Sequence, residues 1–442
     1  MQCLIRTSQL PTHYVLLLLP IFALNLHRLN NHGYINRHLI NLFYKGKILD
    51  IKLSQRVQSI KPSPTLAITA RAAALKAEGK DIIGLGAGEP DFDTPEHIKQ
   101  AAITAINEGK TKYTAVDGTA ELKQAVIDKF SRDNGLDYEG NQILVSVGGK
   151  QSFFNLTQAI LDEGDEVIIP APYWVSYPDM VLLANGTPVI IEAGQDQHFK
   201  ITPEQLEAAI TDKTRLFVIN SPSNPSGMAY SKSELAALGD VLRQHPHVLI
   251  ATDDMYEHIL WAEENFHNIV MACPDLYDRT IVLSGVSKAY SMTGWRIGYA
   301  AGPVSLIAAM KKIQSQSTSN PASISQAAAV EALNGDQQCI QTMLTEFKKR
   351  HDIVVAKLNA MDGIESLESD GTFYVFPNIS KVLERMPNIN DDLDFAEALL
   401  VDKGVAVVPG TAFGLKNHIR LSIATSEENL ENALIRIADF IA

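Results

Sequence analysis

Short apolar runs and amphipathic helical patterns alternate along the middle of the chain. The apolar runs are rich in Val, Ile and Leu, and each has the length of a strand. This alternation predicts an α/β fold with a mainly parallel sheet that helices cover on both faces. The runs expected to form strands are residues 142–147, 165–170, 187–191, 215–220, 248–253, 280–283 and 296–300. Ligands of such sheets bind outside the carboxyl ends of the strands, so candidate residues are sought there.

The pattern changes at about residue 334. Helical patterns come first, and apolar runs follow at residues 371–376, 405–410 and 418–423, with a helix expected from residue 392. This order predicts a smaller α+β domain. The expected divisions are an N-terminal extension at 1–48, an N-terminal arm with part of the small domain at 50–96, a large ligand-binding domain at 97–333 and a small C-terminal domain at 334–442.

Residues 1–48 do not resemble the rest of the chain. Residues 15–24 form an apolar run of signal-peptide length, which is too short to span a bilayer, and no small-residue cleavage site follows. One interpretation is an export signal or a membrane anchor. The interpretation we favour is a non-native or disordered extension, because globular patterning begins near Leu49.

Composition excludes several classes of partner. The chain has 442 residues, of which 46% are hydrophobic and 20% charged, and its formal net charge is −13. Such a charge repels nucleic acid and anionic membranes, so we expect neither as a partner. The cysteines Cys3, Cys273 and Cys339 match no disulfide or zinc pattern, and the histidines have no metal-ligand spacing. We therefore expect a cytoplasmic protein without a metal site.

One lysine has unusual neighbours. Lys288 follows the apolar run 280–283, is surrounded by small residues and is followed by Arg296 eight positions later. Burial at a strand end and a nearby cation both disfavour the ammonium form, so the pKa of Lys288 should fall. A neutral amine is a nucleophile that forms Schiff bases with aldehydes. The alternative is an ordinary lysine at the end of a strand.

Three further strand ends carry groups that suit a flat, anionic ligand. Gly148 and Gly149 lie between a strand and a helix, where backbone N–H groups can hold a phosphate; diglycine turns are also common without a ligand. Trp174 follows another strand, where its indole ring would stack on a heterocycle or simply fill the core. Asn224 lies in a turn that two X-Pro steps make rigid.

Two charged residues lie where charge is costly without a partner. Asp253 ends an apolar strand, so it needs a cation such as a protonated ring nitrogen, unless it caps a helix. Tyr256 comes three residues later and belongs to the same turn. Arg420 lies within an apolar strand, where it pairs either with an Asp or Glu or with the carboxylate of a substrate.

The segment Ser-Lys-x-x-x-Met-x-Gly-x-Arg-x-Gly at residues 287–298 resembles the lysine motif of the class I aminotransferases, which bind pyridoxal 5'-phosphate (PLP). From about residue 50 to the C-terminus the chain is similar to this family, which has the PLP transferase fold type I. Within the family it looks most like the prokaryotic-type aspartate aminotransferases. A dinucleotide-binding interpretation of the glycines before Gly88 fails, because Pro90 and Pro95 prevent a helix from starting there.

The resemblance implies a complete set of cofactor contacts. Lys288 would hold PLP as a Schiff base and transfer the substrate's Cα proton, and Asp253 would keep the ring nitrogen protonated. The other residues implied to contact the cofactor are Gly148, Gly149, Lys150, Trp174, Asn224, Tyr256, Arg296 and, from the second subunit of a homodimer, Tyr113.

The resemblance also implies substrate contacts. Arg420 would bind the α-carboxylate, with help from Gly88, Trp174 and Asn224. Lys150 would bind a second carboxylate, and Lys61 and Thr65 match positions that help some relatives accept prephenate.

The predicted reaction transfers the amino group of L-aspartate to 2-oxoglutarate, giving oxaloacetate and L-glutamate, with prephenate as an additional acceptor. The alternatives are an aminotransferase for aromatic amino acids or alanine and, from another class, a non-catalytic PLP-binding protein.

Overall fold

The computed structural model describes residues 51–60, 62 and 64–442. Contacts divide the chain into two units, Met1–Ser54 and Gln55–Ala442, and the second unit contains every described helix and strand. The expected extension at 1–48 and the candidate residue Lys61 lie outside the described residues. Within the described part of the chain, none of the helices has an apolar stretch long enough to cross a bilayer.

A seven-stranded sheet forms the centre of the large part of the fold, in the order β2-β8-β7-β6-β5-β3-β4. Its strands are β2 (Ile143–Ser146), β3 (Glu166–Ala171), β4 (Thr187–Glu192), β5 (Thr214–Asn220), β6 (Leu249–Asp253), β7 (Thr280–Gly285) and β8 (Gly298–Ala301). The strands from β3 to β7 are parallel, and β8 runs antiparallel to β2 and β7. The predicted mainly parallel sheet is therefore confirmed.

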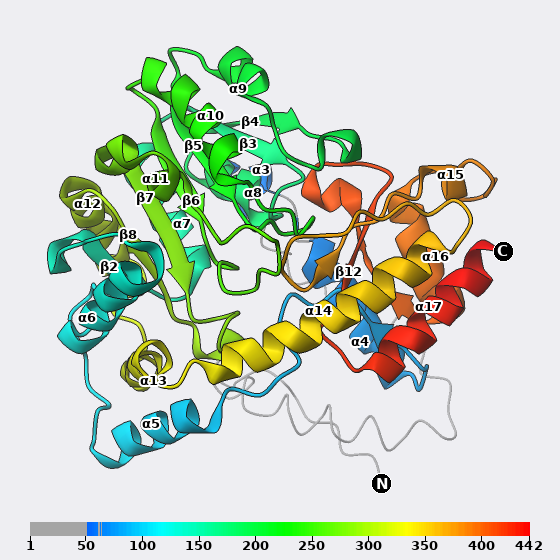
Figure 1. Cartoon of the computed structure of the whole chain (residues 1–442), viewed down its shortest axis with the longest axis horizontal. Helices are drawn as coiled ribbons and strands as arrows, with labels where there is room; N and C mark the ends of the chain where they lie inside the picture. The colour runs from blue at the N-terminus through cyan, green and yellow to red at the C-terminus, as the bar shows by residue number, and fades with distance from the viewer. Residues whose placement is uncertain (1–50, 61, 63) are drawn as a thin grey trace, which may run out of the picture. The chain divides into compact units, whose positions relative to one another are not determined.

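Helices cover both faces of this sheet (Figure 1). Successive residues of β5 show why: Phe217 and Ile219 belong to one buried cluster, and Leu216 and Val218 to another. A strand points its side chains alternately to its two faces, so an uninterrupted apolar run requires a hydrophobic layer on each side. The helices are α5 (Glu96–Asn107), α6 (Ala120–Lys129), α7 (Gly149–Ile160), α8 (Ser176–Leu183), α9 (Pro203–Ala209), α10 (Lys232–Gln244), α11 (Ile269–Ala272), α12 (Val304–Ser315) and α13 (Ser323–Asn334).

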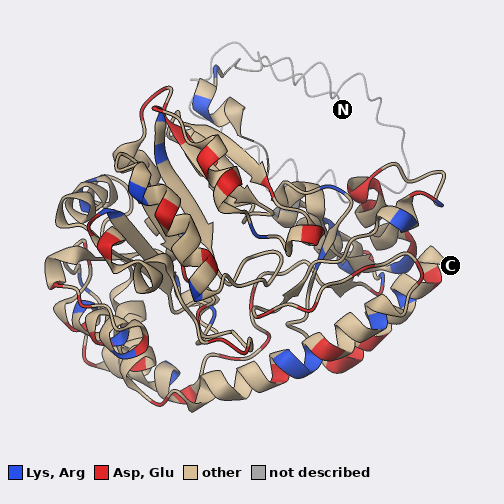
Figure 2. Cartoon of the chain, turned by 45° about the horizontal axis from the view of Figure 1, so that its top comes forward, with Lys and Arg blue, Asp and Glu red and all other residues tan. Residues whose placement is uncertain are grey.

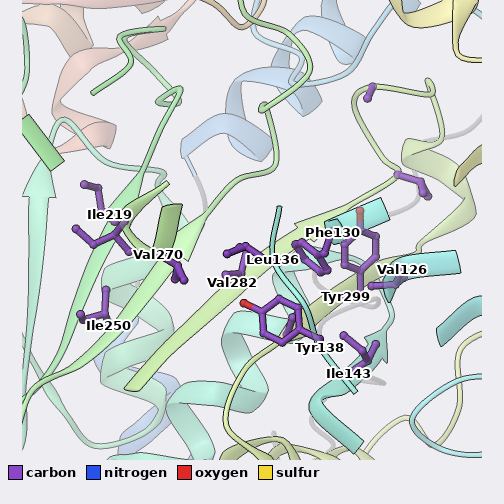
Figure 3. Packing of buried hydrophobic residues seen from close by; sticks show 14 of the residues in the cluster. Val126, Phe130, Leu136, Tyr138, Ile143, Ile219, Ile250, Val270, Val282 and Tyr299 are labelled. Carbon is purple, nitrogen blue, oxygen red and sulfur yellow. The ribbon is translucent and has the colours of Figure 1, made fainter. Parts of the chain in front are cut away.

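Aromatic rings fill one of these layers (Figure 3). Phe130 packs edge to face against Tyr138 at 5.2 Å and against Tyr299 at 5.8 Å, measured between ring centroids. Ile143 of β2 and Val282 of β7 belong to the same cluster. Large rings give this layer buried area and a defined geometry, which keeps the ends of the strands rigid.

The C-terminal elements form a second hydrophobic core. The strands β11 (Val408–Pro409), β12 (Ile419–Ser422) and β9 (Tyr374–Val375) form an antiparallel sheet, and β1 (Ile83–Gly84) pairs in parallel with β10 (Val405–Ala406). The helices near them are α4 (Pro64–Ala77), α14 (Gln338–Asn359), α15 (Ser380–Leu383), α16 (Asp392–Lys403) and α17 (Glu427–Ile441), whereas the short helix α3 (Gln55–Ser59) contacts α8. The single strand expected at 405–410 is instead split at Val407 between two sheets. The domain boundaries stay a prediction.

Acidic and basic residues are interspersed along the outer helices (Figure 2). On α14, Lys357 forms an ion pair of 2.9 Å with Glu431 of α17, and Lys349 forms another with Glu427. Pairs of this kind are exposed and contribute little stability each. The hydrophobic core therefore holds α14 and α17 together.

The start of α5 differs from a simple expectation. Thr94 precedes Pro95 and looks like an N-cap in the sequence, yet Pro95 itself is the cap residue. The Thr94 hydroxyl instead donates to the carbonyl oxygen of Ser291 at 2.7 Å and accepts from the indole N–H of Trp295 at 2.9 Å. This threonine therefore ties the loop after Gly88 to the segment that carries Lys288.

A close backbone approach connects β8 to the start of α7. A Cβ atom on Gly298 would overlap the backbone of Gly148 and Gly149, whereas a Cβ atom on nearby Gly294 would meet nothing within 4 Å. We predict that Gly298→Ala lowers the free energy of unfolding by about 1–3 kcal/mol, as overpacking does, while Gly294→Ala changes it little. Denaturant unfolding of the two variants checks this, and equal midpoints would contradict the proposed clash.

Candidate active site

A cavity of about 490 Å³ opens at the carboxyl ends of the central strands. Asn220 at the end of β5 and Asp253 at the end of β6 line it, and Lys288 follows the end of β7. The structure thus brings together, from segments far apart in the sequence, most of the predicted site. The predicted residues that line the cavity are Thr65, Gly88, Gly149, Lys150, Trp174, Asn224, Asp253, Tyr256, Lys288, Arg296 and Arg420.

Lys288 has the environment that its neighbours in the sequence indicated. Its Nζ donates to the carbonyl oxygen of Gly88 at 2.5 Å. Burial lowers the pKa of Lys288 to about 8, and the positive charge of Arg420 contributes next. The sequence pointed to Arg296 as the nearby cation, but its effect is smaller than that of Arg420. A substantial fraction of this amine is neutral near physiological pH, so it can act as a nucleophile or a base.

Asp253 accepts a hydrogen bond from a tyrosine to which the sequence assigned no role. Tyr177 of α8 donates its hydroxyl to Asp253 Oδ2 at 2.5 Å, and the Met255 N–H donates to Oδ1 at 3.2 Å. Burial raises the pKa of Asp253 despite these hydrogen bonds. Among the described residues Asp253 forms no ion pair, and it caps no helix. A cationic group facing this carboxylate would favour its ionised form.

Arg420 is buried and aims at the cavity. Its two terminal nitrogens donate to the Asn224 side-chain oxygen at 2.9 Å and to the Gly86 carbonyl oxygen at 2.8 Å. Its Nε is buried without a hydrogen-bond partner, and no Asp or Glu among the described residues pairs with it. The expected alternative of an internal ion pair is therefore not what the structure contains. A guanidinium in this state suits a carboxylate ligand.

The start of α7 forms an anion cradle. Gly148 has φ of 82° and is the N-cap of α7, whose first residues, Gly149 and Lys150, line the cavity. A Cβ atom on Gly148 would overlap the guanidinium of Arg296, which shows how closely this side chain approaches the turn. Arg296 also adopts φ of 57° and donates to the Thr293 carbonyl oxygen at 2.7 Å. Backbone N–H groups and a guanidinium are hydrogen-bond donors of the kind that bind the oxygens of a phosphate.

The wall of the cavity carries an indole and an amine. Trp174 packs edge to face against Tyr177 with 5.2 Å between ring centroids, and Lys150 Nζ lies 5.2 Å from the Trp174 ring. Although Lys150 is exposed as a residue, partial burial of its amine and then the charge of Arg296 lower its pKa. An anion bound nearby would relieve this repulsion.

Of the other predicted residues, some line the cavity and one lies outside it. The Tyr256 hydroxyl is 3.0 Å from that of Tyr374, another lining residue to which the sequence assigned no role. The Thr65 hydroxyl, on α4, is buried and has no hydrogen-bond partner among the residues that the structure describes. Tyr113 lies outside the cavity and is 93% exposed. The sequence pattern alone showed only that Tyr113 lies in a loop between two helical segments.

A network of buried charges supports the turn that carries Asp253 and Tyr256. Asp254 accepts hydrogen bonds from Thr252 at 2.6 Å and Asn268 at 2.7 Å, and Glu257 pairs with the fully buried Lys129 at 2.5 Å. Burial, and then the charge of Glu257, raise the pKa of Asp254 to about 8. Burial acts against ionisation of Glu257 as well, but Lys129 outweighs it and lowers that pKa to about 2.

The donor set fits PLP. Lys288 offers an amine to the aldehyde, Gly148 and Arg296 offer a cradle to the phosphate, and Trp174 offers a flat face to the ring. Asp253 offers an uncompensated carboxylate to a ring nitrogen. A mainly parallel sheet with these groups at its strand ends defines the class of PLP-dependent enzymes of fold type I.

Comparison with known proteins agrees. The family described as Aminotransferase class I and II matches residues 80–437, and the chain belongs to this family, whose members are PLP-dependent transaminases acting on amino acids and 2-oxo acids. The chain is 61% identical over 397 residues to an aspartate/prephenate aminotransferase of Nitrosomonas europaea, covering 89% of this chain and all of that one. It is 56% identical to the enzyme of that name from Cereibacter sphaeroides, covering 88% and 98%.

Solved structures give the same result. The aspartate aminotransferase of Rhizobium meliloti superposes with a TM-score of 0.86 at 53% identity, covering 88% of this chain and 99% of that one. The Thermus thermophilus aspartate aminotransferase with maleate superposes with a TM-score of 0.82 at 44% identity, with the same coverage.

The raised pKa of Asp254 predicts a pH-dependent stability. The carboxyl keeps its proton in the fold up to about pH 8 but loses it near 3.8 when unfolded. Folding therefore takes up a proton between these values, and stability falls with rising pH by up to about 1.4 kcal/mol per unit. We predict that Asp254→Asn removes this slope, so that its gain in stability over the wild type grows from pH 5 to pH 8.

Denaturant unfolding at a series of pH values measures this difference. The same substitution at exposed Asp212 is the control and should leave the slope unchanged. A difference between Asp254→Asn and the wild type that does not vary with pH would show that the buried carboxyl is not protonated in the fold.

Proposed function

We propose that this chain transfers the amino group of L-aspartate to 2-oxoglutarate, giving oxaloacetate and L-glutamate. The observation that carries the proposal is a cavity with a low-pKa amine, Lys288, and two further cations, Arg420 and Lys150, that suit the two carboxylates of such substrates. The relatives named as aspartate/prephenate and aspartate aminotransferases support this choice.

Each residue has a separate task in this mechanism. Bound PLP supplies an electron sink for the charge left when the substrate loses its Cα proton. Arg420 would bind the α-carboxylate through a guanidinium whose Nε has no hydrogen-bond partner among the described residues. Lys288 Nζ takes the Cα proton and later returns it, which its pKa of about 8 permits near neutral pH.

The remaining residues hold the cofactor in place. Asp253, held by the hydrogen bond from Tyr177, would stabilise a positive charge on the ring nitrogen of bound PLP. Trp174 would contact the ring, and Gly148 with Arg296 would hold the phosphate. Asn224 and Tyr256 are proposed to contact the phenolic oxygen of the ring, because both line the same cavity.

Prephenate is a second proposed amino-group acceptor. Thr65 lines the cavity, and its buried hydroxyl has no partner within the described ranges, which supports a polar contact with a larger substrate. The names of the relatives support the same proposal. The predicted contribution of Lys61 stays a proposal without structural support.

A homodimer is proposed as well. Tyr113 is 93% exposed, and the apolar residues Ile103 and Ile106 of α5 are 45% and 51% exposed. Exposed apolar side chains near a tyrosine suit a subunit interface. Tyr113 would then contribute to the phosphate site of the second subunit. A cytoplasmic location is proposed from the charge and the cysteine pattern alone.

The proposed reaction has a direct spectroscopic test. We predict that the PLP-loaded protein has a visible absorption band that moves to the near ultraviolet with L-aspartate and returns with 2-oxoglutarate. Lys288→Ala should abolish this cycle, because the Cα proton then has no acceptor. A band that ignores aspartate but responds to alanine or phenylalanine would favour those substrates instead. A band that responds to no amino acid would favour a non-catalytic PLP-binding protein.

Selectivity for dicarboxylates should depend on Lys150. We predict that Lys150→Met lowers kcat/KM for L-aspartate about ten- to hundredfold, because a charge-assisted hydrogen bond of about 1.5–3 kcal/mol is lost. The kcat/KM for L-alanine should change little. Exposed Lys312→Met is the matched control. Equal losses for both amino acids would mean that Lys150 serves the cofactor rather than the second carboxylate.

A further inference from the structure

We propose that Tyr374 is a positioning residue that joins the two halves of the active site. Its ring holds the guanidinium of Arg420, and its hydroxyl holds the hydroxyl of Tyr256. The inference deepens the proposed function, because it assigns one side chain to both the carboxylate site and the cofactor site.

The ring of Tyr374 forms one side of a slot for Arg420. The guanidinium carbon lies 4.3 Å from the centroid of the Tyr374 ring and 4.9 Å from that of Phe413. Arg420 is only 2% exposed, so attraction to the faces of these rings acts in a largely desolvated environment. The rings fix the plane of the guanidinium, and the hydrogen bonds to Asn224 and Gly86 fix its direction. Its Nε has no hydrogen-bond partner in the described part of the chain and is available to a ligand.

The hydroxyl of Tyr374 lies among groups that serve the cofactor. It is 3.0 Å from the Tyr256 hydroxyl, and it would lie 2.9 Å from a Cβ atom placed on Gly88. The carbonyl oxygen of Gly88 in turn accepts a hydrogen bond from Lys288. Tyr374 therefore packs against the loop that receives the amine and at the same time orients the phenol of Tyr256.

The backbone that leads to Tyr374 is strained. Thr372 has φ of 67°, a conformation that a β-branched residue rarely adopts. Its N–H donates to the Ile259 carbonyl oxygen at 2.8 Å, and its hydroxyl accepts from the Tyr374 N–H at 3.2 Å. Such a conformation persists only where the surroundings enforce it. Here the enforced conformation fixes the segment from which Tyr374 reaches the cavity.

A purely structural tyrosine would behave differently from a positioning residue. Tyr374 is 1% exposed, and a phenylalanine would fill the same volume. Substitution by Phe removes the hydroxyl and keeps the ring, whereas substitution by Leu removes both. Phe413→Leu removes the other side of the slot without touching Tyr256. These variants separate the two contacts.

The test uses the PLP-loaded protein and two readouts other than turnover. The first is the midpoint pH at which the visible band titrates, and the second is the dissociation constant of maleate, a dicarboxylate that carries no amino group. We expect Tyr374→Phe to move the midpoint by about half a unit or more, because one hydrogen bond of about 0.5–1.5 kcal/mol near the chromophore is lost. It should change maleate binding less than about threefold.

The other variants complete the prediction. Tyr374→Leu should weaken maleate binding about fivefold beyond Tyr374→Phe, as expected for one cation–π contact of about 1 kcal/mol. Phe413→Leu should weaken maleate binding but leave the midpoint in place. In a Tyr256→Phe background, adding Tyr374→Phe should move the midpoint no further, because the two hydroxyls act through each other.

Three outcomes would overturn the proposal. An unchanged midpoint in Tyr374→Phe removes the role of the hydroxyl, and an equal shift in the Tyr256→Phe background removes the link between the two tyrosines. Equal maleate affinity in Tyr374→Leu and Tyr374→Phe removes the role of the ring. Failure of the proposed function looks different: the wild-type band would ignore L-aspartate, while the midpoint shifts could still be measured.

Discussion

Desolvation of cations at the carboxyl end of the sheet is the constraint on which the rest of the site depends. Lys288 and Arg420 are both held where water is largely excluded, and burial is the main cause that lowers the pKa of each. Neither is neutralised by an ion pair among the described residues. Their remaining stabilisation must come from fixed dipoles, aromatic faces and ligands. Burial makes the charge of Arg420 costly, which favours a carboxylate ligand. Burial also favours the neutral amine of Lys288, which reacts with an aldehyde.

The fold supplies the rigidity that this arrangement requires. Packed hydrophobic layers on both faces of the large sheet fix the ends of β5, β6 and β7, from which Asn220, Asp253 and the Lys288 segment emerge. The separate C-terminal core brings Arg420 and Tyr374 to the opposite side of the cavity. Beneath Asp253, the buried Lys129 and Glu257 pair supports the turn from behind. Catalytic groups from two cores therefore meet without depending on flexible loops.

Periodicity predicted the large sheet well because each strand is a buried apolar run whose alternate residues face two hydrophobic layers, as in β5. The positions of Asp253, Asn224 and Lys288 followed from the rule that ligands bind at strand ends. Other features had no local signal. Nothing near Tyr177 or Tyr374 in the sequence distinguishes either from a core tyrosine. Only the fold places Tyr177 beside Asp253 and Tyr374 beside Arg420.

Tertiary contacts also overrode some local expectations. Thr94 has the chemistry of an N-cap, yet its hydroxyl is taken by Ser291 and Trp295, which lie 197 and 201 residues away in the chain. The apolar run from Val405 to Gly410 looks like one strand but divides between two sheets, because β10 pairs with β1 and β11 with β12. The effect of the Arg420 charge on the pKa of Lys288, second to that of burial, was equally invisible, since the two residues are far apart in the sequence.

The pKa of the Lys288 amine tests the central claim most directly. Acetylation of the PLP-free protein by acetic anhydride over a series of pH values, read by peptide mass spectrometry, reports the neutral fraction of this amine. A midpoint near pH 8 is predicted, because burial and Arg420 disfavour the ammonium form. A midpoint at about pH 10.4, the ordinary value for an exposed lysine, would show that the cavity does not desolvate the amine and would contradict the account.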